Sequence, residues 1–164
     1  MAGSIDDLKK IFLNKSGARR ATVLSYVLCT LISCVLAVVI TYIFNRTGLT
    51  ENEAFQDASD SLMNVSPFFP LLILLYCVVT PLFEEIIFRF LIFGLLYFFS
   101  EKAVLSVLIT ALLFGLYHGN PVQMLYGFLM GLVITWCYYR YRKLSLVFLM
   151  HAAANLVGLL YTLV

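Results

Sequence analysis

Long apolar runs, separated by short polar or basic segments, occupy most of this 164-residue chain. A transmembrane helix needs about 20 consecutive, mostly apolar residues, and the first run, 21–44, is long enough to be one. Hydrophobic residues make up 62% of the chain and charged residues only 12%, about half the charged fraction of a soluble domain. A water-soluble fold of this size could not bury so much apolar surface. The sequence therefore predicts an all-α, multi-pass transmembrane helix bundle.

About five spans are predicted, and they cover residues 21–44, 67–99, 103–118, 122–139 and 144–164. The second run has 33 residues, so it has room for one tilted span or for two short ones. A single span, with Pro81 as a kink point, places the basic residues before the first span on the same side as those in 140–143. Because basic residues concentrate on the cytoplasmic side, we expect a single span here and a cytoplasmic N-terminus in the cell membrane.

Two polar segments flank the first span. Residues 5–13 carry apolar residues at helical spacing between charged ones, which predicts a short interfacial helix within a cytoplasmic N-terminal segment, 1–20. Residues 45–66 are polar and acidic, so they predict an extramembrane loop with room for one or two helical turns. We expect 21–164 to form a single transmembrane domain whose core, 66–158, bears the motifs described below.

Three charged residues, Glu84, Glu85 and Arg89, lie inside the second apolar run, and the other charged residues lie outside the predicted spans. Glu85 and Arg89 are four positions apart and can pair on one helix face, whereas Glu84 is rotated by about 100° from Glu85 in an α-helix. We interpret Glu85 and Arg89 as a structural pair and Glu84, which has no basic residue one turn away, as a general base. The alternative is that all three residues form a buried ion network that fixes helix register. Such a network does not need the second glutamate, whose burial costs additional free energy.

Both histidines fall within or at the end of predicted spans. His118 shares a helix face with Phe114, and His151 shares one with Asn155. Each pair alone is consistent with a polar contact between helices, worth about 1 kcal/mol. Together with Glu84 they supply a base, two imidazoles and a carboxamide, which can activate water and stabilise an oxyanion. Depth is one difficulty, because the helical rise places Glu84 about 22 Å and His151 only about 10 Å from the same end of the bundle.

Several other chemistries lack their sequence patterns. The chain has no His-Glu-x-x-His zinc motif and no Gly-x-Ser-x-Gly elbow, and its aspartates all lie in the two polar segments. The basic residues cluster beside the spans, so the net charge of +2 gives no reason to expect a nucleic-acid partner. Cysteines inside predicted spans, without a Cys-x-x-Cys pair, are typical of a small apolar core residue. These cysteines are Cys29, Cys34, Cys77 and Cys137.

Three short motifs follow one another along the chain. Glu84-Glu-Ile-Ile-Phe-Arg89 matches Glu-Glu-x-x-x-Arg. Phe114-Gly-Leu-Tyr-His118 matches Phe-x-x-x-His, and His151-Ala-Ala-Ala-Asn155 matches His-x-x-x-Asn. In this order, over residues 66–158, they resemble the CAAX prenyl protease type 2 family, also called CPBP or Abi. That family includes bacteriocin-processing and bacteriocin-immunity proteins.

The resemblance implies a role for each motif residue. Glu84 and His118 would activate the attacking water, while His151 and Asn155 would line an oxyanion hole. Hydrolysis without a cofactor is favoured, although a zinc site built from Glu84, His118 and His151 is sterically conceivable. The residues expected to hold the shape of the site are Glu85, Arg89 and Phe114.

The favoured hypothesis is an intramembrane endopeptidase that cleaves a membrane-associated peptide or protein, with a bacteriocin leader or a signalling peptide as the expected substrate. One alternative is a non-catalytic scaffold in the lipid bilayer, such as a bacteriocin immunity or sensor protein that binds in the same cavity. A third is a small transporter or channel subunit with Glu84 in a proton relay. Many family members carry more flanking helices, so a partner helix or a homo-oligomer is also expected.

Overall fold

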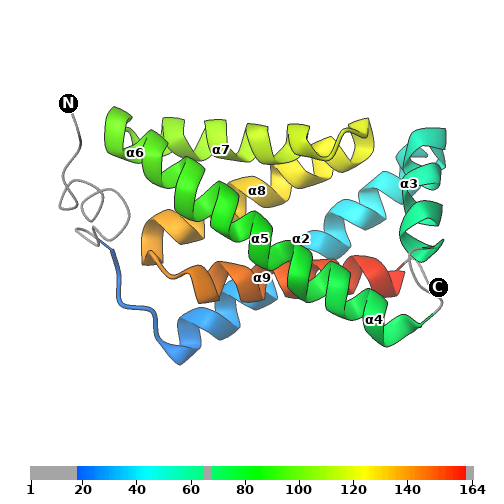
Figure 1. Ribbon diagram of the computed structural model, residues 1–164, viewed down its shortest axis with the longest axis horizontal. Coiled ribbons are helices and arrows are strands. Elements are labelled where there is room, and N and C mark those ends of the chain that lie inside the picture. The colour runs from blue at the N-terminus through cyan, green and yellow to red at the C-terminus, as the bar shows by residue number, and fades with distance from the viewer. Residues whose placement is uncertain (1–17, 65–67, 162–164) are drawn as a thin grey trace.

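The computed structural model describes residues 18–64 and 68–161, and within these ranges all regular elements are helices (Figure 1). The predicted all-α membrane bundle is therefore confirmed. The interfacial helix predicted in residues 5–13 lies outside the described residues. The extent of the transmembrane domain, 21–164, stays a prediction.

Five apolar helices run along the bundle, close to the positions that hydropathy predicts. They are α2 (Val23–Arg46), a composite helix (Phe69–Ser100), α7 (Ala103–Tyr117), α8 (Pro121–Tyr141) and α9 (Leu144–Tyr161). Four of these helices are long and apolar enough to cross a membrane, whereas α7, with 15 residues, is shorter. The second run is one continuous helix of 32 residues, which confirms the choice of a single span.

The composite helix alternates between α-helical and wider π-helical stretches. In chain order its parts are α4 (Phe69–Ile73), η2 (Leu74–Val79), α5 (Thr80–Glu84), η3 (Glu85–Phe93) and α6 (Gly94–Ser100). Pro81 is the second residue after η2, and a π turn before a proline relieves the clash between its ring and the preceding turn. The helix therefore continues through Pro81 and runs diagonally across α9 (Figure 1).

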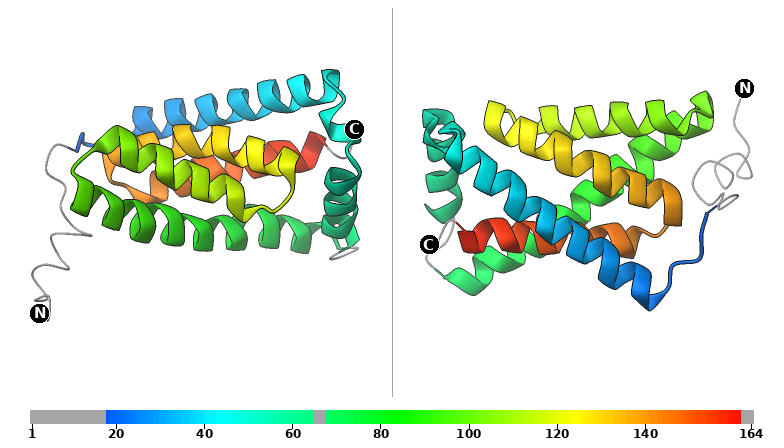
Figure 2. Two further views of the ribbon diagram at one scale, coloured as in Figure 1. Left: turned by 90° about the horizontal axis from the view of Figure 1, so that it is seen from above. Right: turned by 180° about the vertical axis from the view of Figure 1, so that it is seen from behind.

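The segment between α2 and the composite helix is more regular than the predicted loop with one or two turns. A short 3₁₀ turn, η1 (Leu49–Glu51), leads into α3 (Glu53–Asn64), which has 12 residues. Figure 2 shows α3 lying across one end of the bundle, roughly perpendicular to the other helices. The helix is amphipathic, because Phe55 and Ala58 are partly buried while Asp57 and Asp60 are exposed. The prediction of a loop with only one or two helical turns was therefore wrong about the length of this helix. The reason is that an apolar stripe this narrow is a weak signal in a sequence.

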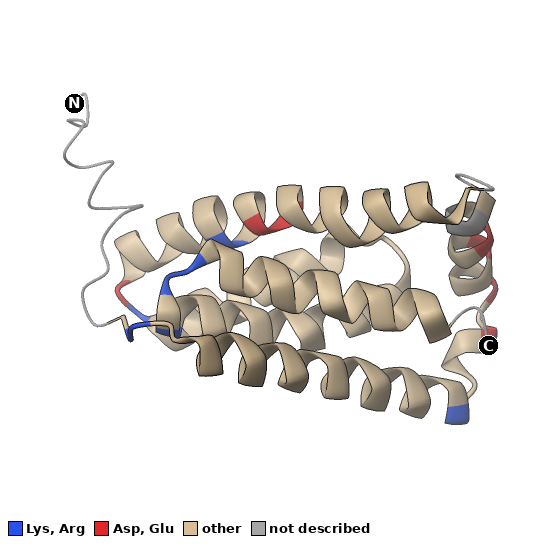
Figure 3. Cartoon of the chain, turned by 90° about the horizontal axis from the view of Figure 1, so that it is seen from below, with Lys and Arg blue, Asp and Glu red and all other residues tan. Residues whose placement is uncertain are grey.

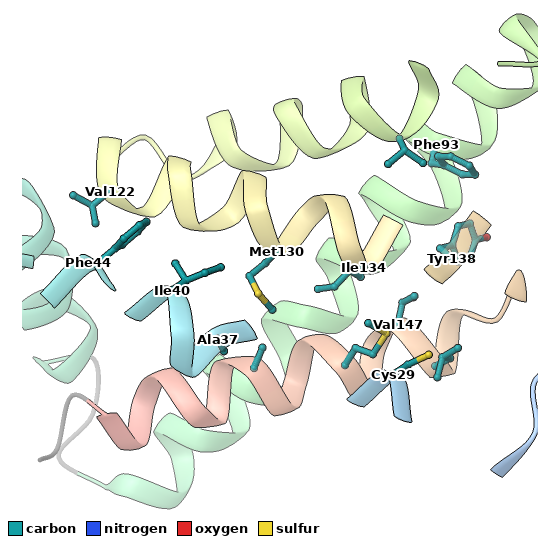
Figure 4. Packing of buried hydrophobic residues seen from close by; sticks show 14 residues of the cluster. Cys29, Ala37, Ile40, Phe44, Phe93, Val122, Met130, Ile134, Tyr138 and Val147 are labelled. Atoms are coloured by element: carbon teal, nitrogen blue, oxygen red, sulfur yellow. The ribbon is translucent and has the colours of Figure 1, made fainter. Parts of the chain in front are cut away.

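The main hydrophobic core lies where α2, α8 and α9 meet (Figure 4). Its fully buried members include Ala37, Ile134 and Val147, one from each of these helices. The other face of α2 is equally apolar but exposed, as Val23 and Val35 show. A helix that is apolar on every side is typical of a membrane span, so this outer face is the one expected to contact lipid.

A tight hairpin joins α7 to α8 and fixes the end of α7. Gly119 adopts a positive φ of 68° in the turn, and the Asn120 side chain accepts hydrogen bonds from the first backbone N–H groups of α8. The two helices approach so closely that a Cβ on Gly115 would lie 2.6 Å from the carbonyl oxygen of Met124. Only glycine fits this crossing, and three residues later His118 lies against α8 at Gly127.

Candidate active site

The composite helix turns its charged residues toward the interior. Glu84 is 6% exposed and Glu85 and Arg89 are fully buried, whereas the neighbouring Phe83 is 61% exposed. Glu84 ends α5 and Glu85 begins the wider η3. The backbone dihedrals of both residues are α-helical, so their side chains leave the helix about 100° apart. Both carboxylates nevertheless reach the same neighbour on α9, His151, a contact that the sequence did not predict.

Glu85 is the centre of a buried ion pair. Its Oε1 accepts a hydrogen bond from Arg89 Nη1 at 2.8 Å, as the spacing of four residues predicts. The same oxygen accepts a second hydrogen bond from His151 Nδ1 at 2.7 Å. The carboxylate thus connects the composite helix to α9, and it fixes the orientation of the His151 ring.

The other ring nitrogen of His151, Nε2, lies 3.4 Å from Glu84 Oε2. One imidazole therefore faces both glutamates, which differs from the oxyanion-hole role that the resemblance implied for His151. The expected difference in depth is absent because α9 begins further inside the bundle than α6 ends (Figure 1). Two carboxylates and the Arg89 guanidinium leave one negative charge, so a single proton held by Glu84 and His151 makes the buried cluster neutral.

The Phe114 ring packs against the buried cluster of charged residues and histidines and is 2% exposed. The Arg89 guanidinium carbon lies 4.2 Å from the centre of the Phe114 ring, a cation–π contact. The rings of His118 and His151 meet the same phenyl group edge to face, with centroids 5.0 Å and 5.5 Å away. Phe114 therefore packs against both histidines and the arginine, and its expected role in holding the shape of the site stays a prediction.

His118 and Asn155 each have one fixed polar contact. His118 Nδ1 lies 2.8 Å from the carbonyl oxygen of Phe114. Because a carbonyl can only accept, Nδ1 donates, and the neutral ring keeps an unprotonated Nε2. Asn155 Nδ2 donates to the carbonyl oxygen of Tyr76 at 3.0 Å, which leaves its second N–H for another acceptor.

These groups surround one cavity of about 340 Å³, which we call the Glu84 cavity. The predicted residues that line it are Glu84, Phe114, His118, His151 and Asn155. Sequence reasoning missed five polar residues in the same lining, namely Tyr76, Thr80, Tyr117, Gln123 and Tyr126. Thr80 lies four positions before Glu84, and Gln123 is a polar residue in an otherwise apolar span, so helical spacing from the motif and polarity could have indicated both.

The zinc alternative considered from the sequence involves Glu84, His118 and His151. In residues 18–64 and 68–161, no group of three His, Cys, Asp or Glu side chains is arranged to hold a metal ion. The two ring nitrogens of His151 face Glu84 and Glu85. Hydrolysis without a cofactor and the zinc alternative both stay predictions.

The fold and site together define a multi-pass membrane protein with a buried carboxylate–histidine cluster. The family model described as type II CAAX prenyl endopeptidase Rce1-like matches residues 66–157, which is more than half of the chain. The chain therefore belongs to this family of membrane proteases, as its three motifs indicated.

Two bacterial relatives are similar over most of the chain. The protein named "Putative membrane peptidase YdiL" from Bacillus subtilis is 30% identical over 70% of the chain and 44% of its own length. The UPF0177 protein YbdI from Lactococcus lactis is 28% identical over 71% of the chain and 60% of its own length. The chain thus spans about half the length of these relatives. No solved structure matches it.

Proposed function

We propose that the chain is an intramembrane endopeptidase that hydrolyses a peptide bond in a membrane-associated peptide or protein. The observation that supports this most strongly is the Glu84 cavity, in which a glutamate, two histidines and an asparagine from three helices line one space inside an apolar bundle. Membership of a membrane protease family supports the same reaction class. The chemistry needs a base, a bound water molecule and a donor for the oxyanion, and these residue types can supply the base and the donor.

In the proposed mechanism, the shared proton starts on His151 and Glu84 takes a proton from water. His118 Nε2 accepts a hydrogen bond from the same water and orients it. The water oxygen attacks the carbonyl carbon, and the C=O electron pair moves to the oxygen. The second N–H of Asn155 donates to this oxyanion. When the carbonyl re-forms, the C–N bond breaks and the Glu84–His151 pair returns a proton to the leaving amine.

Glu85 and Arg89 act as positioning residues in this proposal, because they hold His151 and do not line the Glu84 cavity. A buried pair of this kind costs desolvation energy that must be offset by good geometry. Its two short hydrogen bonds to a single oxygen fix the ring that in turn contacts Glu84. We therefore propose that the Glu85–Arg89 pair preorganises the base Glu84 through His151, and that this is its role rather than stabilisation of the fold.

We further propose that the protein lies in the cell membrane with its N-terminus on the cytoplasmic side. Figure 3 shows most of the basic residues at the end of the bundle where the described chain begins, and the acidic residues of α3 at the other end. This separation is the one that the positive-inside rule favours. A cysteine-free variant carrying Asp57→Cys should react with an impermeant maleimide in intact cells, whereas one carrying Lys143→Cys should react only after lysis.

Incubation of the purified protein with a peptide library, with and without a chelator, tests the proposed activity. We expect cleavage in both conditions and a loss of about 100-fold or more in Glu84→Gln, since a general base contributes about 10²–10⁴-fold. Glu53→Gln, which changes an exposed glutamate of α3 in the same way, is the matched control and should keep full activity.

A folded Glu84→Gln variant as active as the wild type would rule out the proposed mechanism. Retained peptide binding without cleavage by the wild-type protein would instead favour the non-catalytic scaffold. Loss of cleavage on addition of the chelator would show that a metal takes part.

A further inference from the structure

A second, larger cavity lies directly beside the Glu84 cavity. It measures about 540 Å³ and lies between α3, the ends of α2 and α9, and the beginning of α8, so we call it the α3 cavity. This volume falls within the range of about 300–1,000 Å³ that is usual for binding sites. The two cavities share five lining residues, which are Tyr76, Gln123, Tyr126, Ala154 and Asn155. A ligand in one cavity therefore touches residues that also line the other.

The lining of the α3 cavity combines apolar surface with neutral polar groups. Phe55 and Leu159 contribute apolar surface, while hydroxyl and amide groups come from Thr41, Ser59 and Gln123 among others. No charged side chain belongs to the described lining of this cavity. Hydroxyls and amides can pair with both the N–H and the C=O of a peptide backbone, whereas a charged ligand group would be buried here without a counter-charge.

Hydrogen bonds between different elements hold the walls of the α3 cavity. Asn45, at the end of α2, donates to the hydroxyl of Tyr161 at 3.1 Å and accepts from Thr50 at 3.3 Å. On the other side, Asn120 donates to the carbonyl oxygen of Ala54, which ties α3 to the start of α8. These hydrogen bonds join elements that are far apart in the sequence. The walls of the cavity are therefore held together by specific contacts.

We propose that the α3 cavity binds several uncharged residues of the substrate polypeptide on one side of the scissile bond, while that bond lies beside Glu84. This inference rests on the proposed endopeptidase function and assigns a substrate class to it. Tyr126 and Gln123 line both cavities, so their side chains stand where the substrate chain would pass from one to the other. Their size and hydrogen bonding would then determine which residue can sit next to the scissile bond.

Two positions on α3 provide a matched pair for the test. Ala58 lines the cavity, whereas Gln56, two residues earlier, is exposed. The probe is a quenched library of ten-residue peptides with uncharged random sequence, together with versions shortened by three residues at either end. We expect Ala58→Trp to lower kcat/KM about tenfold or more on the ten-residue peptides, since the indole fills space that the substrate needs. Gln56→Trp should change it less than about twofold.

Shortening adds a second readout, because peptides that no longer reach the α3 cavity should be cleaved equally by Ala58→Trp and the wild type. Similar kinetics of the Ala58→Trp and Gln56→Trp variants on the ten-residue library would overturn the inference. So would an equal loss in Ala58→Trp on long peptides and on both shortened versions.

Photo-cross-linking separates this inference from the proposed hydrolysis. Benzoylphenylalanine replaces Phe55, which lines the α3 cavity and is already aromatic, or the exposed Gln56, in a Glu84→Gln background, and the ten-residue library is again the probe. Cross-linking at position 55 but not at 56 supports peptide binding in the α3 cavity even if the wild-type protein cleaves no peptide. Cross-linking of co-purified lipid at position 55, with no peptide product, would assign the cavity to an acyl chain and overturn the inference.

Discussion

The Glu84 cavity and the α3 cavity share a wall but hold their polar groups in different ways. Beside the first, Glu85 pairs with Arg89 and His151, and Phe114 packs under both partners. In the second, the described polar lining residues are neutral, and bonds such as that between Asn45 and Tyr161 join its walls. Charges inside an apolar bundle are costly, so they remain where each is compensated and where chemistry needs them. Neutral groups suffice for holding a polypeptide, and they leave more open space.

The largest expected effect comes from removing the positive charge behind the first cavity. Arg89→Leu leaves Glu85 buried with only His151 as a partner, and breaking a buried pair in this way costs about 3–5 kcal/mol. Unfolding in mixed detergent micelles measures the loss. Arg46→Leu, at the exposed end of α2, is the matched control and should cost less than about 1 kcal/mol. If both variants lost the same free energy of unfolding, the buried ion cluster would contribute no more to stability than the exposed end of α2.

A smaller effect is expected where α8 touches His118, the histidine proposed to orient the water. A Cβ on Gly127 would lie 3.1 Å from Nδ1 and 3.2 Å from Cε1 of His118, so Gly127→Ala must displace the ring by a few tenths of an ångström. Because misplacement of a reacting group by about 1 Å can cost 10²-fold, we expect a loss of about tenfold in kcat. Stability should change by less than about 1 kcal/mol, since alanine favours a helix over glycine.

Gly158→Ala isolates the helix contribution to stability, because a Cβ there has no neighbour within 4 Å. A Gly127→Ala protein with wild-type kcat would argue against a catalytic position for His118. A large loss of stability in Gly127→Ala but not in Gly158→Ala would instead mean that the contact serves packing.

The smallest effect is expected in the wall of the α3 cavity. Tyr161→Phe removes the hydroxyl that accepts a hydrogen bond from Asn45, and such a bond contributes about 0.5–1.5 kcal/mol. We expect a loss of stability near the lower end of that range and at most about a threefold rise in KM for ten-residue peptides. Kinetics on long and shortened peptides measure this. If Tyr161→Phe lowered kcat on the shortened peptides, the α3 cavity would affect the chemical step and not only the binding of the substrate, contrary to the proposal.

Sequence patterns predicted the helices well but not their local geometry. Hydropathy located all five apolar helices, because an apolar run of this length has few alternatives to a membrane span. Side-chain spacing also predicted the contact between Glu85 and Arg89, which depends on one helix alone. Hydropathy did not predict α3, whose apolar face is only a narrow stripe, or the π-helical geometry of η3.

The order of the apolar runs and motifs by itself determined the architecture, the family and the charged residues and histidines placed inside the bundle, since each is encoded in neighbouring residues. Only the tertiary structure decided that His151 faces both glutamates and that Gln123 and Tyr126 line two adjoining cavities. Such contacts depend on how steeply one helix crosses another and where each begins along the bundle axis. Those quantities are set by packing among distant segments, as the close approach at Gly115 shows.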